Sequence, residues 1–215
     1  AEIGVKRFIF LSSIGVNGSN NLEPFTEQHE ACPHDLYAVT KLEAEQKLQA
    51  LAANSKMDVT IIRPPLVYGP KAPGNFSSLM HWMNKSVPLP LGAIHNQRSL
   101  VALDNLVNFI IYCIDCPQAA NEVFLISDGE DVSTTELLQH IAKALRKKSW
   151  LIPMPVSWMI FVARLVGKNA MATRLFGSLQ VDSSKARELL GWKPIITMDE
   201  QLKKTAEAYL NKRCD

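Results

Sequence analysis

Two polar side chains stand four residues apart at the start of a segment with helical character. Tyr37 and Lys41 lie in the run LYAVTKLEAEQ, and residues four apart on a helix share one face. Lys41 would place an ammonium beside the Tyr37 hydroxyl, which favours the phenolate and lowers the pKa of the tyrosine. Tyr37 could then act as a base near neutral pH. The alternative is structural, with Lys41 extending to water and Tyr37 packing with a solvated hydroxyl.

A pair of serines precedes this helix. The run RFIFL has the composition of a strand, Ser12 and Ser13 follow it, and a polar loop then leads to the helix. Ligands of parallel α/β sheets gather at the carboxyl ends of strands. Ser13 could therefore hydrogen-bond the same substrate oxygen as Tyr37. Alternatively, both serines satisfy backbone groups of a turn.

The rest of the chain alternates strand-like and helix-like segments, which predicts an α/β fold. Strands are expected over residues 5–11, 58–63, 99–103 and 122–127, and helices over 37–53, 105–116, 133–146 and 183–190. Asp104 is expected to cap the second of these helices. Ser133 and Glu136 form a capping-box pattern at the third, and Gly191 is expected to end the last clear helix.

Composition excludes several classes of protein. The 215 residues are 47% hydrophobic, which suffices for a sizeable core, and a net charge of +2 from dispersed Lys and Arg disfavours nucleic-acid binding. Four cysteines without a regular framework favour a reducing cytosol. Cys113 and Cys116 form a C-x-x-C at the end of an apolar run, which we interpret as part of a core helix rather than a redox or metal site.

No segment reaches the roughly 20 apolar residues of a membrane span, so no transmembrane segment is predicted. The nearest is VSWMIFVARLVG at residues 156–167, which is too short and carries Arg164. This segment is expected to be a buried or partner-facing helix, with contact at a membrane interface as the alternative.

Five blocks of sequence carry a resemblance to a known family. In chain order they are FIFLSSIGVNG, YAVTK, IIRPPLVYGP, RSLVALDNL and VDSSKARELLGWKP. Their order and spacing resemble the extended short-chain dehydrogenase/reductase superfamily, in its NAD-dependent nucleotide-sugar epimerase/dehydratase branch. The resemblance implies an α/β fold made of a partial Rossmann domain, a doubly wound parallel sheet, and a smaller C-terminal substrate-binding α/β domain.

The same resemblance predicts the domain organisation. Residues 1–70 would form the C-terminal part of the Rossmann NAD(P)-binding domain, and residues 71–215 mainly the sugar-nucleotide-binding domain, with a Rossmann strand and helix near 99–116 interleaved. The glycine-rich G-x-x-G-x-x-G loop of the family does not occur in this sequence, since an acidic loop follows Gly15 and Gly18. We therefore expect a C-terminal fragment, and the choice between NAD and NADP stays open.

Site residues are carried over from the family position by position. The resemblance implies a catalytic triad of Ser13, Tyr37 and Lys41, in which the tyrosine takes the proton of a sugar hydroxyl, the serine holds the reacting oxygen and the lysine also binds the nicotinamide ribose. The implied cofactor contacts are Tyr37, Lys41, Pro64 and Val67. The implied substrate contacts are Asn75, Leu89, Leu91, Arg98 and Arg174, with Arg98 on the nucleotide diphosphate. The alternative for Pro64 is that prolines merely end the preceding strand. The alternative for the arginines is that they are solvated surface side chains.

The implied function is a cytoplasmic NAD(P)-dependent epimerase acting at C4 of a UDP-hexose or UDP-N-acetylhexosamine, homodimeric when full length. A UDP-4-keto-sugar reductase using NAD(P)H is the alternative among enzymes. A non-catalytic nucleotide-sugar-binding fragment is the alternative of another class, because the chain by itself could lack activity. Asn17 and Leu66 depart from common family residues, which indicates substrate recognition unlike that of simple hexose epimerases.

Overall fold

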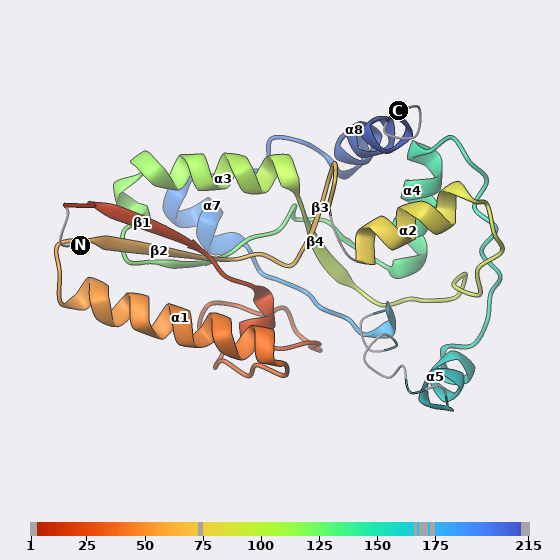
Figure 1. The fold of residues 1–215 in the computed structure, drawn as a ribbon, viewed down its shortest axis with the longest axis horizontal. Coiled ribbons are helices and arrows are strands. Elements are labelled where there is room, and N and C mark those ends of the chain that lie inside the picture. The colour runs from red at the N-terminus through yellow and green to blue at the C-terminus, as the bar shows by residue number, and fades with distance from the viewer. Residues whose placement is uncertain (1–3, 73–74, 166, 168–171, 173–174, 212–215) are drawn as a thin grey trace.

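The computed structural model describes residues 4–72, 75–165, 167, 172 and 175–211. These residues form an α/β fold with two small sheets placed side by side along the long axis of the molecule, as Figure 1 shows. Helices cover both sheets, so the predicted α/β class is confirmed.

The first sheet consists of parallel strands in the order β1, β2, β5 within the described part of the chain. Their bounds are Arg7–Leu11 for β1, Asp58–Arg63 for β2 and Val123–Leu125 for β5. Side chains of β2 alternate between two apolar clusters: Val59 and Ile61 pack toward Leu48 and Ala52, whereas Ile62 packs with Phe109 and Phe124. This period of two explains why the strand is buried on both faces.

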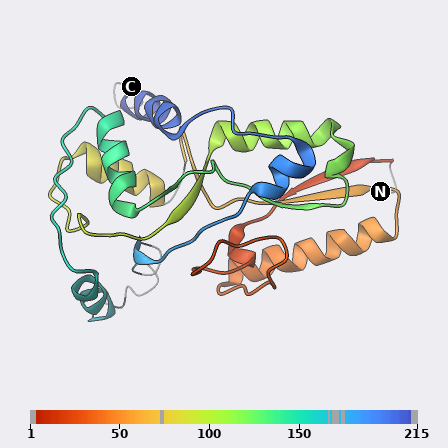
Figure 2. The ribbon, with the colours of Figure 1, turned by 180° about the vertical axis from the view of Figure 1, so that it is seen from behind.

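Three helices flank the first sheet. Helix α1 spans Leu36–Ala53, α3 spans Leu103–Asp115 and α7 spans Ser184–Leu190. Helix α1 lies along one face of the sheet and α3 along the other, and Figure 2 shows α7 on the same side as α3. Two short 3₁₀ helices, η1 at Ile14–Val16 and η2 at Pro117–Ala119, complete this part.

The second sheet contains β3 (Leu66–Tyr68), β4 (Arg98–Ala102) and β6 (Asp131–Val132). Strands β3 and β4 are parallel, and β6 pairs with β4 in the antiparallel direction. A large apolar cluster joins this sheet to α2 (Asn75–Asn84), α4 (Thr134–Ala144) and α8 (Met198–Asn211). Helix α5 (Val156–Leu165) stands apart from both sheets in Figures 1 and 2.

Several local predictions can be compared with these elements. The capping box is confirmed: Ser133 Oγ accepts from Glu136 N at 3.1 Å and the Glu136 carboxylate accepts from Ser133 N at 2.7 Å. Gly191 ends α7 in the left-handed conformation with φ 70°, as predicted. The Asp104 cap is wrong: Ala102 is the N-cap, and Asp104 lies in the first turn and binds Lys204 Nζ at 2.8 Å.

Helix 183–190 is not the last helix, because α8 follows it. The sequence of α8 is polar overall, yet its buried residues Met198, Leu202 and Ala206 recur every four positions. This spacing places them on one face of a helix, which packs on α4. Acidic residues in its first turn also suit a helix N-terminus.

The strand and the helix near 99–116 belong to different sheets. Helix α3 covers the first sheet through Phe109 and Cys113, whereas β4 pairs with β3 and β6 in the second. Strand β5 and helix α7, both beyond residue 71, also belong to the first sheet. We propose that the chain passes repeatedly between two structural units, more often than the single interleaved segment near 99–116 that the resemblance implies.

Two further sequence interpretations concern cysteine and membrane contact. Cys113 is on the buried face of α3, in the apolar cluster of the first sheet, which confirms the core-helix interpretation. Burial also raises the pKa of its thiol to about 12. Among the described helices none is long and apolar enough to cross a membrane.

The buried side chain of Gln201 allows a test of how α8 packs. Its side-chain amide is fully buried and neither polar atom has a hydrogen-bond partner among the described residues. An unsatisfied buried amide costs free energy, so we expect Gln201→Met to raise the free energy of unfolding by about 1–2 kcal/mol in urea denaturation. Gln46→Met, at an exposed position of α1, should change it by less than about 0.5 kcal/mol. A loss of stability in Gln201→Met would show that the amide is satisfied.

Candidate active site

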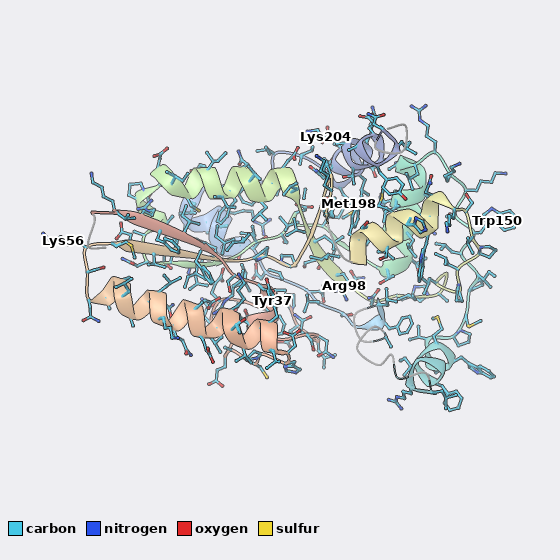
Figure 3. The ribbon with its side chains drawn as sticks, viewed as in Figure 1. Tyr37, Lys56, Arg98, Trp150, Met198 and Lys204 are labelled. Carbon is cyan, nitrogen blue, oxygen red and sulfur yellow. The ribbon has the colours of Figure 1, made fainter. Side chains whose placement is uncertain are left out.

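A cavity of about 370 Å³ lies where the two sheets meet. Four predicted site residues line it, each from a different element of the fold: Ser13, Tyr37, Val67 and Arg98. Figure 3 labels Tyr37 at the start of α1 and Arg98 beside the second sheet, near the middle of the molecule. The fold therefore brings together residues that are as much as 85 positions apart in the chain.

Ser13 is held in place by the turn that follows β1. It is the N-cap of η1, and its Oγ accepts a hydrogen bond from Gly15 N at 3.1 Å. The next backbone N–H, of Ile14, donates to the Pro64 carbonyl at 3.0 Å. Ser13 thus has the turn role that the sequence allowed, and it also borders the cavity.

The beginning of α1 sets the position of Tyr37. Asp35 caps this helix by accepting from Ala38 N at 2.8 Å, which places Tyr37 in the first turn. The Tyr37 side chain is 59% exposed and lies at the cavity rather than in the core. The buried residues of α1 are instead Ala38 and Glu45.

Lys41 reaches back to the end of β1. Its Nζ donates to the Leu11 carbonyl at 2.8 Å and lies 4.8 Å from the centroid of the Phe10 ring. The same ammonium lies 5.7 Å from the centroid of the Tyr37 ring. Lys41 is therefore tied to the strand end instead of extending into water, with its charge beside the tyrosine.

Arg98 approaches the cavity from the second sheet. It begins β4 and is half-buried, and its Nη1 donates to the Gly177 carbonyl at 3.0 Å. Burial lowers the pKa of the guanidinium from its usual range, but arginine starts so high that it stays cationic at neutral pH. A fixed cation at a cavity wall is suited to an anionic ligand.

Other predicted site residues do not line the cavity. Pro64 is buried, and its carbonyl accepts the hydrogen bond of Ile14 N. Leu89 and Leu91 lie in the apolar cluster of the second sheet, because the segment around them runs beside residues 150–152 through backbone hydrogen bonds. Asn75 begins α2, but its side chain lies outside the described residues, as does Arg174.

Some cavity residues were not predicted. The polar ones include His34, Asp35 and Thr134, and the apolar ones include Leu175 and Leu179. Asp35 could have been found from its position as the helix cap before Tyr37. Thr134 lies in the Ser133–Glu136 capping box and Leu179 just before the VDSSKARELLGWKP block, but neither pattern points to a cavity so far along the chain from Tyr37.

A buried polar network joins the elements that carry Ser13 and Tyr37. Arg63, at the end of β2, donates from Nε to Glu45 Oε1 at 3.0 Å and from Nη1 to Asn17 Oδ1 at 3.0 Å. Its Nη2 also donates to Glu45 Oε2, which makes the ion pair bidentate. Asn17, one of the departures from the family pattern, thus connects η1 to α1 through Arg63.

We expect Glu45→Gln to destabilise the protein by about 3–5 kcal/mol, because it leaves the buried Arg63 charge without a carboxylate. Urea denaturation measures this loss. Glu43→Gln, at an exposed position of the same helix, is the matched control and should stay within about 0.5 kcal/mol of the parent. Equal stability of the two variants would contradict a structural role for the pair.

Comparison with known proteins places this geometry in a family. The model of the NAD dependent epimerase/dehydratase family matches residues 1–127. The chain belongs to this family. The match includes the Ser13, Tyr37, Lys41 and Val67 positions, and the predicted superfamily is confirmed.

Individual members of the family resemble the chain over most of its length. The UDP-glucose 4-epimerase of Vibrio cholerae is 51% identical over 212 residues, which are 97% of this chain and 65% of that protein. The N-acetyl-alpha-D-glucosaminyl-diphospho-ditrans,octacis-undecaprenol 4-epimerase of Escherichia coli O157:H7 is 31% identical over 160 residues, 73% of this chain and 48% of that protein. The chain thus spans less than two thirds of the length of both relatives.

Solved structures of the family agree with the fold. The UDP-glucose 4-epimerase of Thermotoga maritima, solved with UDP-glucose, has a TM-score of 0.73 at 26% identity and covers 100% of this chain and 66% of its own. The UDP-glucuronic acid 4-epimerase of Bacillus cereus, solved with NAD, has a TM-score of 0.77 at 20% identity, covering 97% and 63%. At 20% identity the second likeness concerns the fold alone.

Proposed function

We propose that this chain carries the proton-transfer and sugar-diphosphate sites of an NAD(P)-dependent epimerase that acts at C4 of a UDP-hexose or UDP-N-acetylhexosamine. The supporting observation is the single cavity lined by Ser13, Tyr37 and Arg98. Family membership and 51% identity with a UDP-glucose 4-epimerase point to the same reaction class.

Arg98 is the proposed clamp for the substrate diphosphate. Its planar guanidinium can donate two parallel hydrogen bonds to phosphate oxygens, and its partly buried setting strengthens the attraction to an anion. The Gly177 carbonyl holds one side of the guanidinium, which fixes its direction before a substrate arrives. Little rotamer entropy then remains to be lost on binding.

Tyr37 is the proposed proton acceptor and donor, and Ser13 the group that orients the reacting oxygen. The Tyr37 hydroxyl belongs to an exposed side chain at the cavity, so a sugar hydroxyl can reach it. Lys41 places a positive charge beside the Tyr37 ring, and the Leu11 carbonyl prevents it from swinging away. The charge favours transfer of the sugar proton to the phenolic oxygen.

The chain fits one end of a nicotinamide dinucleotide. The Lys41 ammonium has three N–H donors and uses one of them to bind the Leu11 carbonyl. Ser12 follows directly after β1, and its Oγ is buried with no partner among the described residues. Val67 supplies an apolar wall. We propose that Tyr37, Lys41, Pro64 and Val67 hold this end, where the cofactor supplies a hydride acceptor and donor at the sugar carbon. The choice between NAD and NADP stays open.

Other functions lead to different observations. A UDP-4-keto-sugar reductase would consume NAD(P)H, whereas an epimerase leaves it unchanged. A sugar diphosphate on a lipid carrier presents the same diphosphate to Arg98, and the Escherichia coli relative is named for such a substrate. A non-catalytic binding fragment would bind UDP without turnover. The cytoplasmic location and the homodimer stay proposals.

We expect Tyr37→Phe in the complete protein to lower the rate of C4 interconversion of UDP-N-acetylglucosamine by about 10²–10⁴-fold, because the proton acceptor is lost. Product is measured by chromatography with NAD supplied. The binding of UDP, followed by calorimetry, should change little, since Arg98 is intact. Arg98→Lys should instead weaken the binding of UDP, because lysine lacks the planar group that can bind phosphate at two points.

Tyr209→Phe is the matched control, because its hydroxyl is on α8 and 3.4 Å from His81 Nδ1, away from the cavity. It should keep the parent rate. Turnover of Tyr37→Phe at that rate would refute the proposed role. Strict consumption of NADPH by a 4-keto sugar, without interconversion, would identify the reductase instead.

A further inference from the structure

One segment of the chain has a charge unlike the rest. Residues 137–181 contain no Asp or Glu, although the chain has 21 of them among its 215 residues. The same segment has seven of the 23 basic residues: Lys143, Arg146, Lys147, Lys148, Arg164, Lys168 and Arg174. The nearly neutral total charge therefore conceals a strongly positive region.

The same region exposes large apolar side chains. Within the described residues 150–165, six such side chains are exposed: Trp150, Ile152, Met154, Trp158, Phe161 and Leu165. Trp158 is 68% exposed and Leu165 is 71% exposed. Several large exposed apolar side chains in one short segment are typical of an interaction surface.

Helix α5 directs these side chains outward as a group. Trp158, Phe161 and Leu165 are separated by three and four positions, so they share one helical face. Met159 is buried in the cluster of the second sheet and attaches the helix to the fold. In Figures 1 and 2 the helix lies away from both sheets. Its three apolar side chains Trp158, Phe161 and Leu165 are each at least 60% exposed.

Basic side chains border the apolar ones. Lys147 and Lys148 line a hollow of about 700 Å³ together with Trp150 and Ile152. Figure 3 shows Trp150 at the end of the molecule beyond α4 and α2. Lys143 also lines the hollow but is bound to Asp199 Oδ2 at 2.6 Å. Two lysines beside an indole can accept a phosphate group with its apolar attachment.

We propose that residues 146–165 form a membrane-contacting surface that seats the protein on a bilayer containing anionic phospholipid. Tryptophan and phenylalanine favour the boundary between headgroups and acyl chains, and nearby lysine and arginine bind anionic headgroups. None of the described helices is long and apolar enough to cross a bilayer, and the proposed contact lies in the plane of the bilayer surface. The inference is independent of the proposed catalytic function.

Charge argues against a second copy as the occupant. A two-fold dimer through residues 146–165 would bring together two sets of Arg146, Lys147, Lys148 and Arg164, and this segment contains no carboxylate to pair with them. Among the described residues β1 is an edge strand, and Val5, Phe8 and Leu11 are separate exposed apolar side chains on it or just before it. Figure 1 shows β1 at the end of the molecule opposite α5.

Vesicle co-sedimentation tests the proposal with the unmodified chain. We expect binding to vesicles of mixed phosphatidylcholine and phosphatidylglycerol, weaker binding to phosphatidylcholine alone, and release at high salt. Trp158→Ser with Phe161→Ser should abolish measurable binding. Lys147→Gln with Lys148→Gln should weaken it about 25-fold, at roughly fivefold for each lysine, the equivalent of about 1 kcal/mol per charge. Tryptophan emission should shift to the blue on binding.

The controls make the same kinds of substitution at other exposed positions. Leu22→Ser replaces a fully exposed apolar side chain, and Lys56→Gln with Lys193→Gln removes two exposed charges. Both should bind vesicles like the parent, and all variants should keep its unfolding midpoint. Absence of binding, or equal loss in controls and test variants, would overturn the proposal. A smaller molecular mass in Trp158→Ser with Phe161→Ser would instead identify a second copy as the occupant.

Discussion

The ion pair between Glu45 and Arg63 is the interaction on which the cavity depends. Glu45 is on α1, Arg63 ends β2, and Asn17 extends the contact to η1. Each partner is buried, so a movement of any of the three elements would take a partner away from the charged Arg63 side chain in an apolar environment. Tyr37 and Lys41 are on the same helix as Glu45, and Ser13 begins the same turn as Asn17. The pair thereby fixes the proposed catalytic side chains without contacting them.

A second polar network fixes the sheets relative to each other. Asp128 accepts hydrogen bonds from the Tyr68 hydroxyl at 2.7 Å, from Ala102 N at 2.9 Å and from Asn105 Nδ2 at 2.7 Å. Burial raises the pKa of Asp128 and also that of Tyr68, so the tyrosine keeps its proton and remains the donor. The network links β3, β4 and α3 to the loop after β5, and thus fixes the two strands that carry Val67 and Arg98 relative to the first sheet.

Local patterns in the sequence were sufficient for local features, and non-local contacts decided the rest. The cap at Ser133, the end of α7 at Gly191 and the position of Ser13 after β1 follow from residues within a few positions. The partner of β4 could not be inferred, since any apolar strand can pair in either sheet. Leu89 and Leu91 became core residues because of the distant segment 150–152. Helix α8 did have a readable four-residue spacing that its polar composition obscured.

The two networks together explain how a substrate could be positioned along its length. Tyr37 belongs to the first sheet and its helix, while Arg98 belongs to the second sheet, so a ligand that contacts both must span the junction. The Asp128 network sets the separation of the sheets, and the Glu45 pair sets the orientation of α1 within the first. The distance from the proposed diphosphate clamp to the proposed proton acceptor is thus a property of the fold rather than of flexible side chains. A sugar diphosphate would be selected by that distance, and the carbon that reaches Tyr37 would follow from it.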